Sequence, residues 1–214
     1  MKQLVLIIFF LFCISSFVCS APIYEKLWTQ FLQDHSKVYI KSDIEYVHIN
    51  YKDIALSQRF QSLRRVLTSL DLTRFSENEK KVLLLNQYNL YLIESVIFPN
   101  SNYEKELNQI KDQLLIKDKD LLFLLGTTDK TLFNLVAFQT EGIDEQISKQ
   151  KLMTLKKLVT INRSNQYFYV HRWLKQHFPV VEEQKDLIRF VYPTIQLDKF
   201  SVHYIDMDPV LNDY

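Results

Sequence analysis

The sequence predicts an α+β fold that is rich in helix, with a small antiparallel sheet, in a single domain. Most apolar residues recur every three or four positions, which is the spacing of an amphipathic helix. Near the C-terminus, two short runs of β-branched and aromatic residues flank a polar turn, which is typical of a β-hairpin. The chain has 214 residues and is 47% hydrophobic, enough for one core, and no linker rich in Pro, Gly or Ser divides residues 21–214.

The first twenty residues have the parts of a secretory signal peptide. Lys2 precedes an apolar run from Leu4 to Val18, and small residues follow at Ser20 and Ala21. The run is shorter than the ~20 residues that span a bilayer, which disfavours the alternative of a retained membrane anchor. We therefore expect residues 1–20 to be cleaved and the mature chain to be exported, either periplasmic or secreted, without a stable membrane anchor.

Apolar spacing predicts two helices before residue 75. The first begins at Pro22, whose fixed φ suits the first turn of a helix. The second begins at Asn50, whose side chain can accept a hydrogen bond from a first-turn N–H, and it continues to Asp71. The apolar positions are Ile23, Leu27, Phe31 and Leu32 in the first helix and Ile54, Leu56, Phe60, Leu63, Val66, Leu67 and Leu70 in the second.

The pattern Ser-x-x-Glu occurs twice and predicts the start of two further helices. In such a capping box the Ser side chain accepts from the Glu backbone N–H, while the Glu side chain reaches back to the Ser N–H. Ser76 and Glu79 open a helix over residues 77–97, and Ser101 and Glu104 open a shorter one that ends near residue 114.

The remaining elements alternate between helix and strand. The unbroken apolar run over residues 121–125 predicts a strand buried on both faces. We expect a hairpin of residues 159–161 and 166–170, and a last alternating strand over residues 200–205. Helices are expected over residues 143–158, 171–177 and 182–191.

Composition excludes several classes of function. The chain carries 26 basic and 25 acidic residues, so no positive excess is available for phosphates and we expect no nucleic-acid partner. Gly126 and Gly142 stand alone, which leaves no glycine-rich phosphate loop or nucleophile elbow. Both cysteines, Cys13 and Cys19, lie in the expected signal peptide, so the mature chain has no thiol for catalysis, zinc binding or haem attachment. We expect no cofactor.

Three stretches of the chain carry a family resemblance. The one that begins at Glu79 follows the pattern E-x-x-A-F-W-I-N-x-Y-N-A-L, with further matches at Asn86, Tyr88 and Asn89. The others are residues 49–54, which approach V-D-Y-x-x-L, and a C-terminal part, residues 171–178 and 204–213, which approach F-K-W-Y-x-x-D-F and Y-L-x-Y-D-W-S-L-N-D. In order and spacing they resemble the domain of unknown function 547 family, a group of bacterial, usually exported proteins related in fold to papain-like and transglutaminase-like cysteine hydrolases. The resemblance implies a papain-like or transglutaminase-like fold.

Departures from that family decide the expected function. Leu122 stands where its members have a His, and Thr127 and Leu132 stand where they have two Cys. A thiolate nucleophile needs an adjacent base or a helix dipole, and these positions supply neither the thiol nor the base. We therefore expect a secreted, non-catalytic binding protein, a pseudoenzyme of bacterial type that acts on a host or envelope macromolecule. The alternative is a hydrolase or acyl-transfer enzyme with a non-cysteine site, with Thr127 or Thr128 as nucleophile.

Polar residues on one helix are the first candidates for binding. Asn86 and Asn89 lie three apart on one face of an otherwise apolar helix, with Tyr88 beside them. Buried amides need hydrogen-bond partners, so these residues either form an internal network or line a residual cleft.

Aromatic residues near the C-terminus are the second group of candidates. Tyr167 and Tyr169 alternate with Phe168 on a predicted strand, so one side packs in the core and the other is available to a protein or glycan partner. Trp173, in the C-terminal part of the resemblance, is a further candidate.

Asp206 and Asp208 are weak candidates for metal ligands. Alternate acidic oxygens can face one cation, but this segment lacks the glycine and the bidentate glutamate of a calcium loop. We predict no metal site and keep a calcium-dependent surface module as a third alternative. His171 and His177 lie six apart, on different faces of a helix, and do not form a pair of metal ligands.

Overall fold

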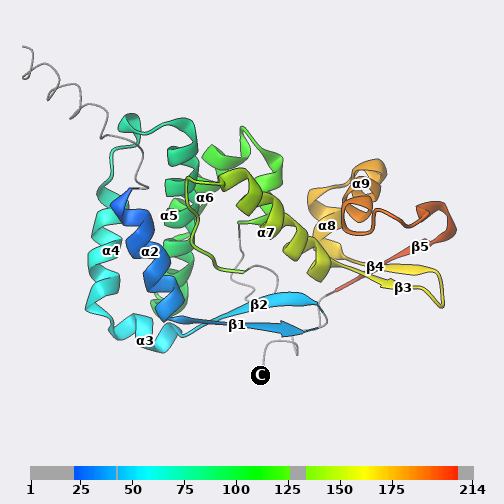
Figure 1. Ribbon diagram of the computed structural model, residues 1–214, viewed down its shortest axis with the longest axis horizontal. Coiled ribbons are helices and arrows are strands. Elements are labelled where there is room, and N and C mark those ends of the chain that lie inside the picture. The colour runs from blue at the N-terminus through cyan, green and yellow to red at the C-terminus, as the bar shows by residue number, and fades with distance from the viewer. Residues whose placement is uncertain (1–21, 42, 126–133, 207–214) are drawn as a thin grey trace, which may run out of the picture.

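The fold is α+β, as predicted, in a computed structural model that describes residues 22–41, 43–125 and 134–206. Its elements in chain order are α2 (Ile23–Asp34), β1 (Ser36–Lys41), β2 (Ile44–Ile49), α3 (Tyr51–Leu56), α4 (Gln58–Ser69), η1 (Leu72–Arg74), α5 (Glu77–Ile97), α6 (Glu104–Leu115), η2 (Lys119–Phe123), α7 (Ile143–Leu158), β3 (Val159–Asn162), β4 (Tyr167–His171), α8 (Arg172–His177), α9 (Val181–Val191), η3 (Leu197–Lys199) and β5 (Ser201–Ile205). Helices α2, α4 and α5 stand side by side at one end of the molecule, and the β3–β4–β5 sheet lies at the other end, with α7 between them (Figure 1).

The second predicted helix is two helices, so the expectation of one helix from Asn50 to Asp71 was wrong. Asn50 caps α3 as predicted, because its Oδ1 accepts from the Asp53 N–H at 3.2 Å. Ser57 then takes an extended backbone, and its hydroxyl accepts from the Phe60 N–H at 3.3 Å, which starts α4. Ser favours such a cap over a helix interior, and the apolar spacing continues across the break.

The hairpin of β1 and β2 was not predicted. The two strands pair antiparallel over their whole length, with Val38 opposite Val47, and Asp43 between them has a positive φ of 61°. The short polar side chain of Asp tolerates that conformation in turns. β-branched and aromatic residues in succession, Val38, Tyr39 and Ile40, are the sequence signal that could have identified it.

The two predicted capping boxes had different outcomes. At α5 the box is complete: the Ser76 hydroxyl accepts from the Glu79 N–H at 3.4 Å, and Glu79 Oε2 accepts from the Ser76 N–H at 2.7 Å. At α6 the helix begins as predicted, but the box does not form, because Asn102 Oδ1, not the Ser101 hydroxyl, accepts from the Glu104 N–H, at 3.1 Å. An Asn side chain readily bonds to the backbone N–H two residues on, as it does here.

The predicted strand over residues 121–125 was also wrong. Residues 121–123 are the last part of the 3-10 helix η2, and residues 124 and 125 follow it. Asp118 caps η2 by accepting from the Asp120 N–H at 2.9 Å. All five apolar side chains are buried, as the run of leucines indicated. A short buried run has no period that separates a strand from a turn of helix, which explains the error.

The C-terminal elements follow the prediction except in the direction of one strand pair. β3 and β4 form the expected antiparallel hairpin, and α7, α8, α9 and β5 lie where they were expected. β5, however, pairs parallel with β4, so this sheet is mixed. Helices α8 and α9 make the crossover that a parallel connection requires, and they cover one face of the sheet (Figure 1).

Helix α5 is shared by two clusters of buried apolar residues. One cluster packs α5 against α7, η2 and the β3–β4–β5 sheet, and the other packs it against α2, α3 and α4. The residues of α5 divide between the two clusters: Val82 and Leu85 belong to the first, whereas Leu83 and Leu90 belong to the second. The capped start of this buried helix is therefore firmly positioned, and the pocket described next is built on it.

Candidate functional site

An open pocket of about 530 Å³ lies where the first two turns of α5 meet the C-terminal end of α6. We call it the α5–α6 pocket. Its apolar wall comes from η1, α5, α6 and η2, and its rim carries charged side chains from the start of α5 and from the residues before η2. The apolar residues are Leu72, Leu84, Leu114, Ile116 and Leu121, and the charged residues are Glu77, Lys80, Lys81, Lys117 and Asp118.

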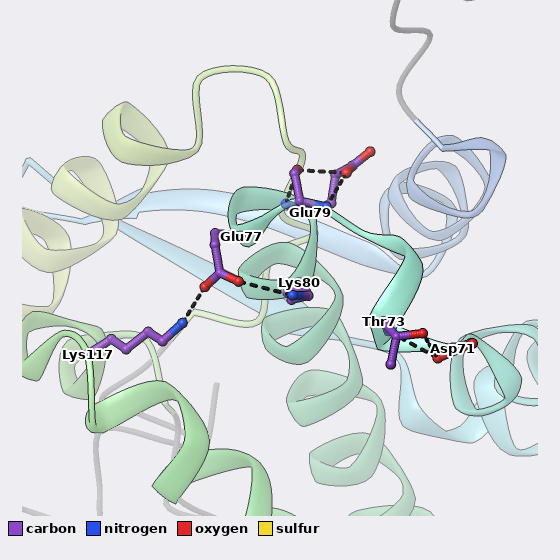
Figure 2. Close-up of polar contacts among 7 residues, drawn as sticks. Asp71, Thr73, Glu77, Glu79, Lys80 and Lys117 are labelled. Atoms are coloured by element: carbon purple, nitrogen blue, oxygen red, sulfur yellow. Dashed lines mark hydrogen bonds and ion pairs between the residues drawn. The ribbon is translucent and has the colours of Figure 1, made fainter.

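The pocket walls are held by local side-chain caps. The Asp71 carboxylate accepts from the Thr73 N–H at 3.0 Å and from the Thr73 hydroxyl at 2.7 Å, which fixes η1 (Figure 2). The Thr73 hydroxyl and N–H hold the pKa of Asp71 below its usual value. The Ser76–Glu79 box then fixes the entry into α5, and Asp118 fixes η2 on the opposite wall.

Glu77 bridges two lysines at the pocket rim. It accepts from Lys80 Nζ at 3.0 Å, within the first turns of α5, and from Lys117 Nζ, which comes from the segment after α6 (Figure 2). The hydrogen bond from Lys117, followed by the one from Lys80, lowers the pKa of Glu77 to about 2. Glu77 is therefore ionised at neutral pH and binds two ammonium groups, one at each carboxylate oxygen.

The pocket rim has an excess of positive charge. Lys80, Lys81 and Lys117 face two carboxylates, Glu77 and Asp118. Lys81 forms a long ion pair, at 3.8 Å, with the exposed carboxylate of Asp144 on α7. An apolar wall next to clustered ammonium groups can hold a ligand with an apolar body and an anionic end. Sequence analysis missed this site, because Lys on a helix is usually part of a solvated face.

Asn86 and Asn89 form the internal network that was one of the two expectations for them. The Asn86 amide donates to the Phe138 carbonyl and accepts from the Phe138 N–H, both at 2.9 Å, and Asn89 donates to the Val136 carbonyl at 2.8 Å. These bonds tie α5 to the extended segment 134–139, not to a sheet. Tyr88 is buried beside them, and burial raises its pKa to about 12. The α5–α6 pocket contains none of the three.

Tyr167 and Tyr169 lie on the sheet face opposite Phe168, as predicted. Phe168 is buried and packs against Phe200 and Tyr192, with ring centroids 5.0 and 5.8 Å away. On the outer face, the Tyr167 ring lies 4.2 Å from the exposed His203 ring and 6.4 Å from the Tyr169 ring.

The outer face also brings β5 into the candidate surface. Tyr169 pairs with His203 in the parallel register, and Ile205, two residues on, is 42% exposed. We call Tyr167, Tyr169, His203 and Ile205 the aromatic face. His203 was missed because nothing in the local sequence indicates which strand pairs with β4.

Trp173 is a core residue in this structure. Its ring is buried and lies 4.3 Å from the His177 ring and 5.9 Å from the Phe123 ring. His171 and His177 act locally, as expected: His171 Nδ1 accepts from the Trp173 N–H, and His177 Nδ1 lies 2.9 Å from the Trp173 carbonyl.

The positions singled out by the family resemblance are only partly described. Leu122 is buried in η2. Thr127, Thr128, Leu132 and Asp208 lie outside the described residues.

Asp206, the other weak candidate for a metal ligand, forms an exposed ion pair with Arg172 at 3.2 Å. Over residues 22–41, 43–125 and 134–206, no three His, Cys, Asp or Glu side chains gather to hold a metal ion.

A second group of charged residues lies between α4, α5 and α6, and Glu94 is its buried member. The side chain of Glu94 is 1% exposed, and its Oε1 accepts from Arg64 Nε at 2.5 Å. Within the described part of the chain, Glu94 Oε2 and Glu106 Oε2 are buried without a hydrogen-bond partner. Burial raises the pKa of Glu94, Arg64 opposes the shift, and the charge of Glu106 adds to it.

A half-buried lysine, Lys157, joins α7 to the β1–β2 hairpin. Lys157 Nζ donates to Asn134 Oδ1 at 2.8 Å and lies 4.6 Å from the Tyr46 ring centroid. The Asn134 side chain also accepts from the Val47 N–H and donates to the Glu45 carbonyl. Burial lowers the pKa of Lys157 to about 8, against a smaller opposite effect of Glu45.

Comparisons with known proteins do not identify a relative. No family model matches the chain, and no curated protein or solved structure is significantly similar to it. None of the helices in the described segments has the length and apolar character needed to cross a membrane.

Proposed function

We propose that this protein is an exported, non-catalytic binding protein that recognises a protein partner through the aromatic face. The observation that carries the proposal is the cluster of Tyr167, Tyr169 and His203 on the outer face of the β3–β4–β5 sheet. Export rests on the signal-peptide pattern of residues 1–20. The absence of catalysis rests on the family resemblance and on the residues that depart from it, among them Leu122.

The aromatic face has the composition of a protein-binding surface. Tyr is enriched among the residues that dominate interface energies, because its ring buries a large area and its hydroxyl forms a hydrogen bond. Ile205, the last residue of β5, adds exposed apolar surface to the patch. At its edge, Arg172 and Asp206 form an exposed ion pair, which resembles the polar rim around an apolar interface centre.

The ring geometry favours a protein over a glycan. The Tyr167 and Tyr169 rings meet at 80°, and the Tyr167 and His203 rings at 56°. Rings at these angles present a ridged surface with gaps between them, which suits protruding side chains. A sugar ring stacks on a flat exposed aromatic face, and these three rings do not form a common plane.

The proposal is tested by affinity capture followed by a binding measurement on the captured protein. The mature chain from Ala21 onward is used to capture proteins from envelope and host extracts, and each candidate is then titrated by calorimetry. Tyr169→Asp places a charge at the centre of the aromatic face, and we expect it to lower the affinity for a specific partner at least tenfold. Leu56→Asp is the matched control, since Leu56 is an exposed apolar residue on α3, at the other end of the molecule.

Two results would overturn the proposal. A partner whose affinity is the same for Tyr169→Asp and the native chain does not use the aromatic face. Binding to a glycan array that depends on Tyr169, without any protein partner, would assign the face to carbohydrate instead. A screen of peptide and ester hydrolysis with the same protein tests the enzymatic alternative.

A further inference from the structure

We propose that the α5–α6 pocket binds a medium-chain carboxylate, with the acid group on Lys80 and Lys117 and the alkyl chain along the apolar wall. This site is separate from the aromatic face and does not depend on the proposed function. A volume of about 530 Å³ lies within the range of roughly 300–1,000 Å³ that is usual for small-molecule sites.

The lysine pair is arranged for a carboxylate, as Glu77 shows. One Glu77 carboxylate bonds to both Lys80 Nζ and Lys117 Nζ, so the two ammonium groups lie within reach of a single acid group. Each ammonium has three N–H donors, and the bond to Glu77 uses one of them. A second carboxylate can therefore bridge the same two lysines from the pocket side.

The charge of the rim favours an acid over a neutral or basic ligand. Asp118 is engaged in capping η2, and Glu77 is shared between two lysines. Lys81 adds a third ammonium group whose ion pair with Asp144 is long, at 3.8 Å. The rim thus carries three ammonium groups against two carboxylates, so a ligand carboxylate would balance the excess charge, whereas an amine would add to it.

The apolar wall accounts for the alkyl part of the ligand. Leu114 and Leu121 are buried at the base, and Leu72 is half-buried at the side. Ile116 stands at the edge of the pocket with 82% of its surface exposed. An alkyl chain that lies along this wall removes Ile116 and its own methylenes from water, which a short acid such as acetate cannot do.

The experiment is a calorimetric titration of the mature protein with a series of acids. Acetate, hexanoate, octanoate and decanoate are used below their micelle concentrations, and 1-octanol is the uncharged probe. We expect saturable binding of one octanoate per chain and a gain in affinity of roughly fourfold per added methylene. We expect 1-octanol to bind at least tenfold more weakly than octanoate.

Substitutions at the rim separate the role of charge from that of the apolar wall. Lys80→Gln with Lys117→Gln should weaken octanoate binding at least tenfold. Glu77→Gln should strengthen it, because the two lysines lose the negative charge that balances them inside the protein. The control pair is Glu182 and Lys185 on α9, which has the same spacing, a similar length of 2.8 Å and comparable exposure. Glu182→Gln and Lys185→Gln should leave binding unchanged. Circular dichroism and thermal melting check that each variant is folded.

The proposal is overturned by any of three results. The first is that octanoate binding does not saturate, and the second is that 1-octanol binds as tightly as octanoate. The third is that the folded variant with both lysines substituted binds octanoate with native affinity. Methyl NMR shifts that map octanoate to residues other than Leu114, Leu121 and Ile116 would also reject this pocket as the site.

Discussion

The side-chain amide of Asn86 hydrogen-bonds to both backbone groups of Phe138, with the donor and the acceptor bond each at 2.9 Å. The two residues are 52 positions apart, and both are fully or almost fully buried. The amide thus takes the place of a neighbouring strand for the extended segment 134–139. A buried backbone segment needs such partners, and here a helix side chain supplies them.

The first prediction concerns this pair. Asn86→Ala leaves the N–H and the C=O of Phe138 without their partner, so we expect it to lower the free energy of unfolding by roughly 2–6 kcal/mol, at about 1–3 kcal/mol per buried group. Asn89→Ala is the matched variant, because among the described residues Asn89 donates to a single carbonyl, that of Val136. Asn89→Ala should lower the free energy of unfolding by about half as much as Asn86→Ala, measured by urea unfolding. Equal costs for the two variants would contradict the pairing as described.

Sequence analysis predicted the elements whose signals are local. The capping box at Ser76 and the N-cap at Asn50 were identified correctly, because each depends on residues three positions apart. The break at Ser57 was missed, since a serine between two amphipathic stretches is compatible with a continuous helix or with a cap. The parallel pairing of β5 with β4 depends on the crossover through α8 and α9, which no local pattern encodes.

Candidate site residues were also predicted where the signal is local and missed where it depends on contacts between distant parts of the chain. The alternation of Tyr167, Phe168 and Tyr169 follows from strand geometry and was predicted, whereas His203 joins them only through the sheet register. The α5–α6 pocket depends on Lys117 meeting Glu77 across 40 positions, so its charges looked like ordinary solvated residues in the sequence.

The second prediction concerns the charge of Glu77. Because Lys117 and Lys80 lower its pKa to about 2, we expect the side-chain carboxyl of Glu77 to titrate near pH 2 in a carbon-detected NMR experiment. Lys117→Gln should move the midpoint toward 4.5, the ordinary value for Glu, because the strongest of its hydrogen bonds is lost. A midpoint that stays near 2 in this variant would show that Lys117 does not hold the carboxylate.

The third prediction concerns the pH dependence caused by Glu94. Its pKa is raised in the folded state, chiefly by burial, so the folded chain binds more protons than the unfolded chain in the window above the ordinary Glu pKa. The free energy of unfolding should therefore fall as the pH rises from about 4.5 through the folded pKa. Glu94→Gln keeps an acceptor for Arg64 but does not titrate. The free energy of unfolding of this variant, relative to that of the native chain, should therefore grow with pH. Urea unfolding at several pH values between 4 and 7 measures this difference, and a constant difference would reject the prediction.

The fourth prediction concerns Lys157, for which the sign is opposite to that of Glu94. Burial lowers its pKa to about 8, so between pH 8 and 10.5 the unfolded chain binds more protons than the folded chain. The charged form of Lys157 is disfavoured in the folded chain, so the free energy of unfolding should increase as the pH rises through this window. In the native chain the Lys157 ammonium nitrogen lies 4.6 Å from the centroid of the Tyr46 ring. Lys157→Met removes the titrating group and keeps an apolar side chain beside that ring. We expect the native chain to gain stability relative to Lys157→Met between pH 8 and 10.5 in urea unfolding, and parallel curves for the two proteins would show that Lys157 titrates as an ordinary surface lysine.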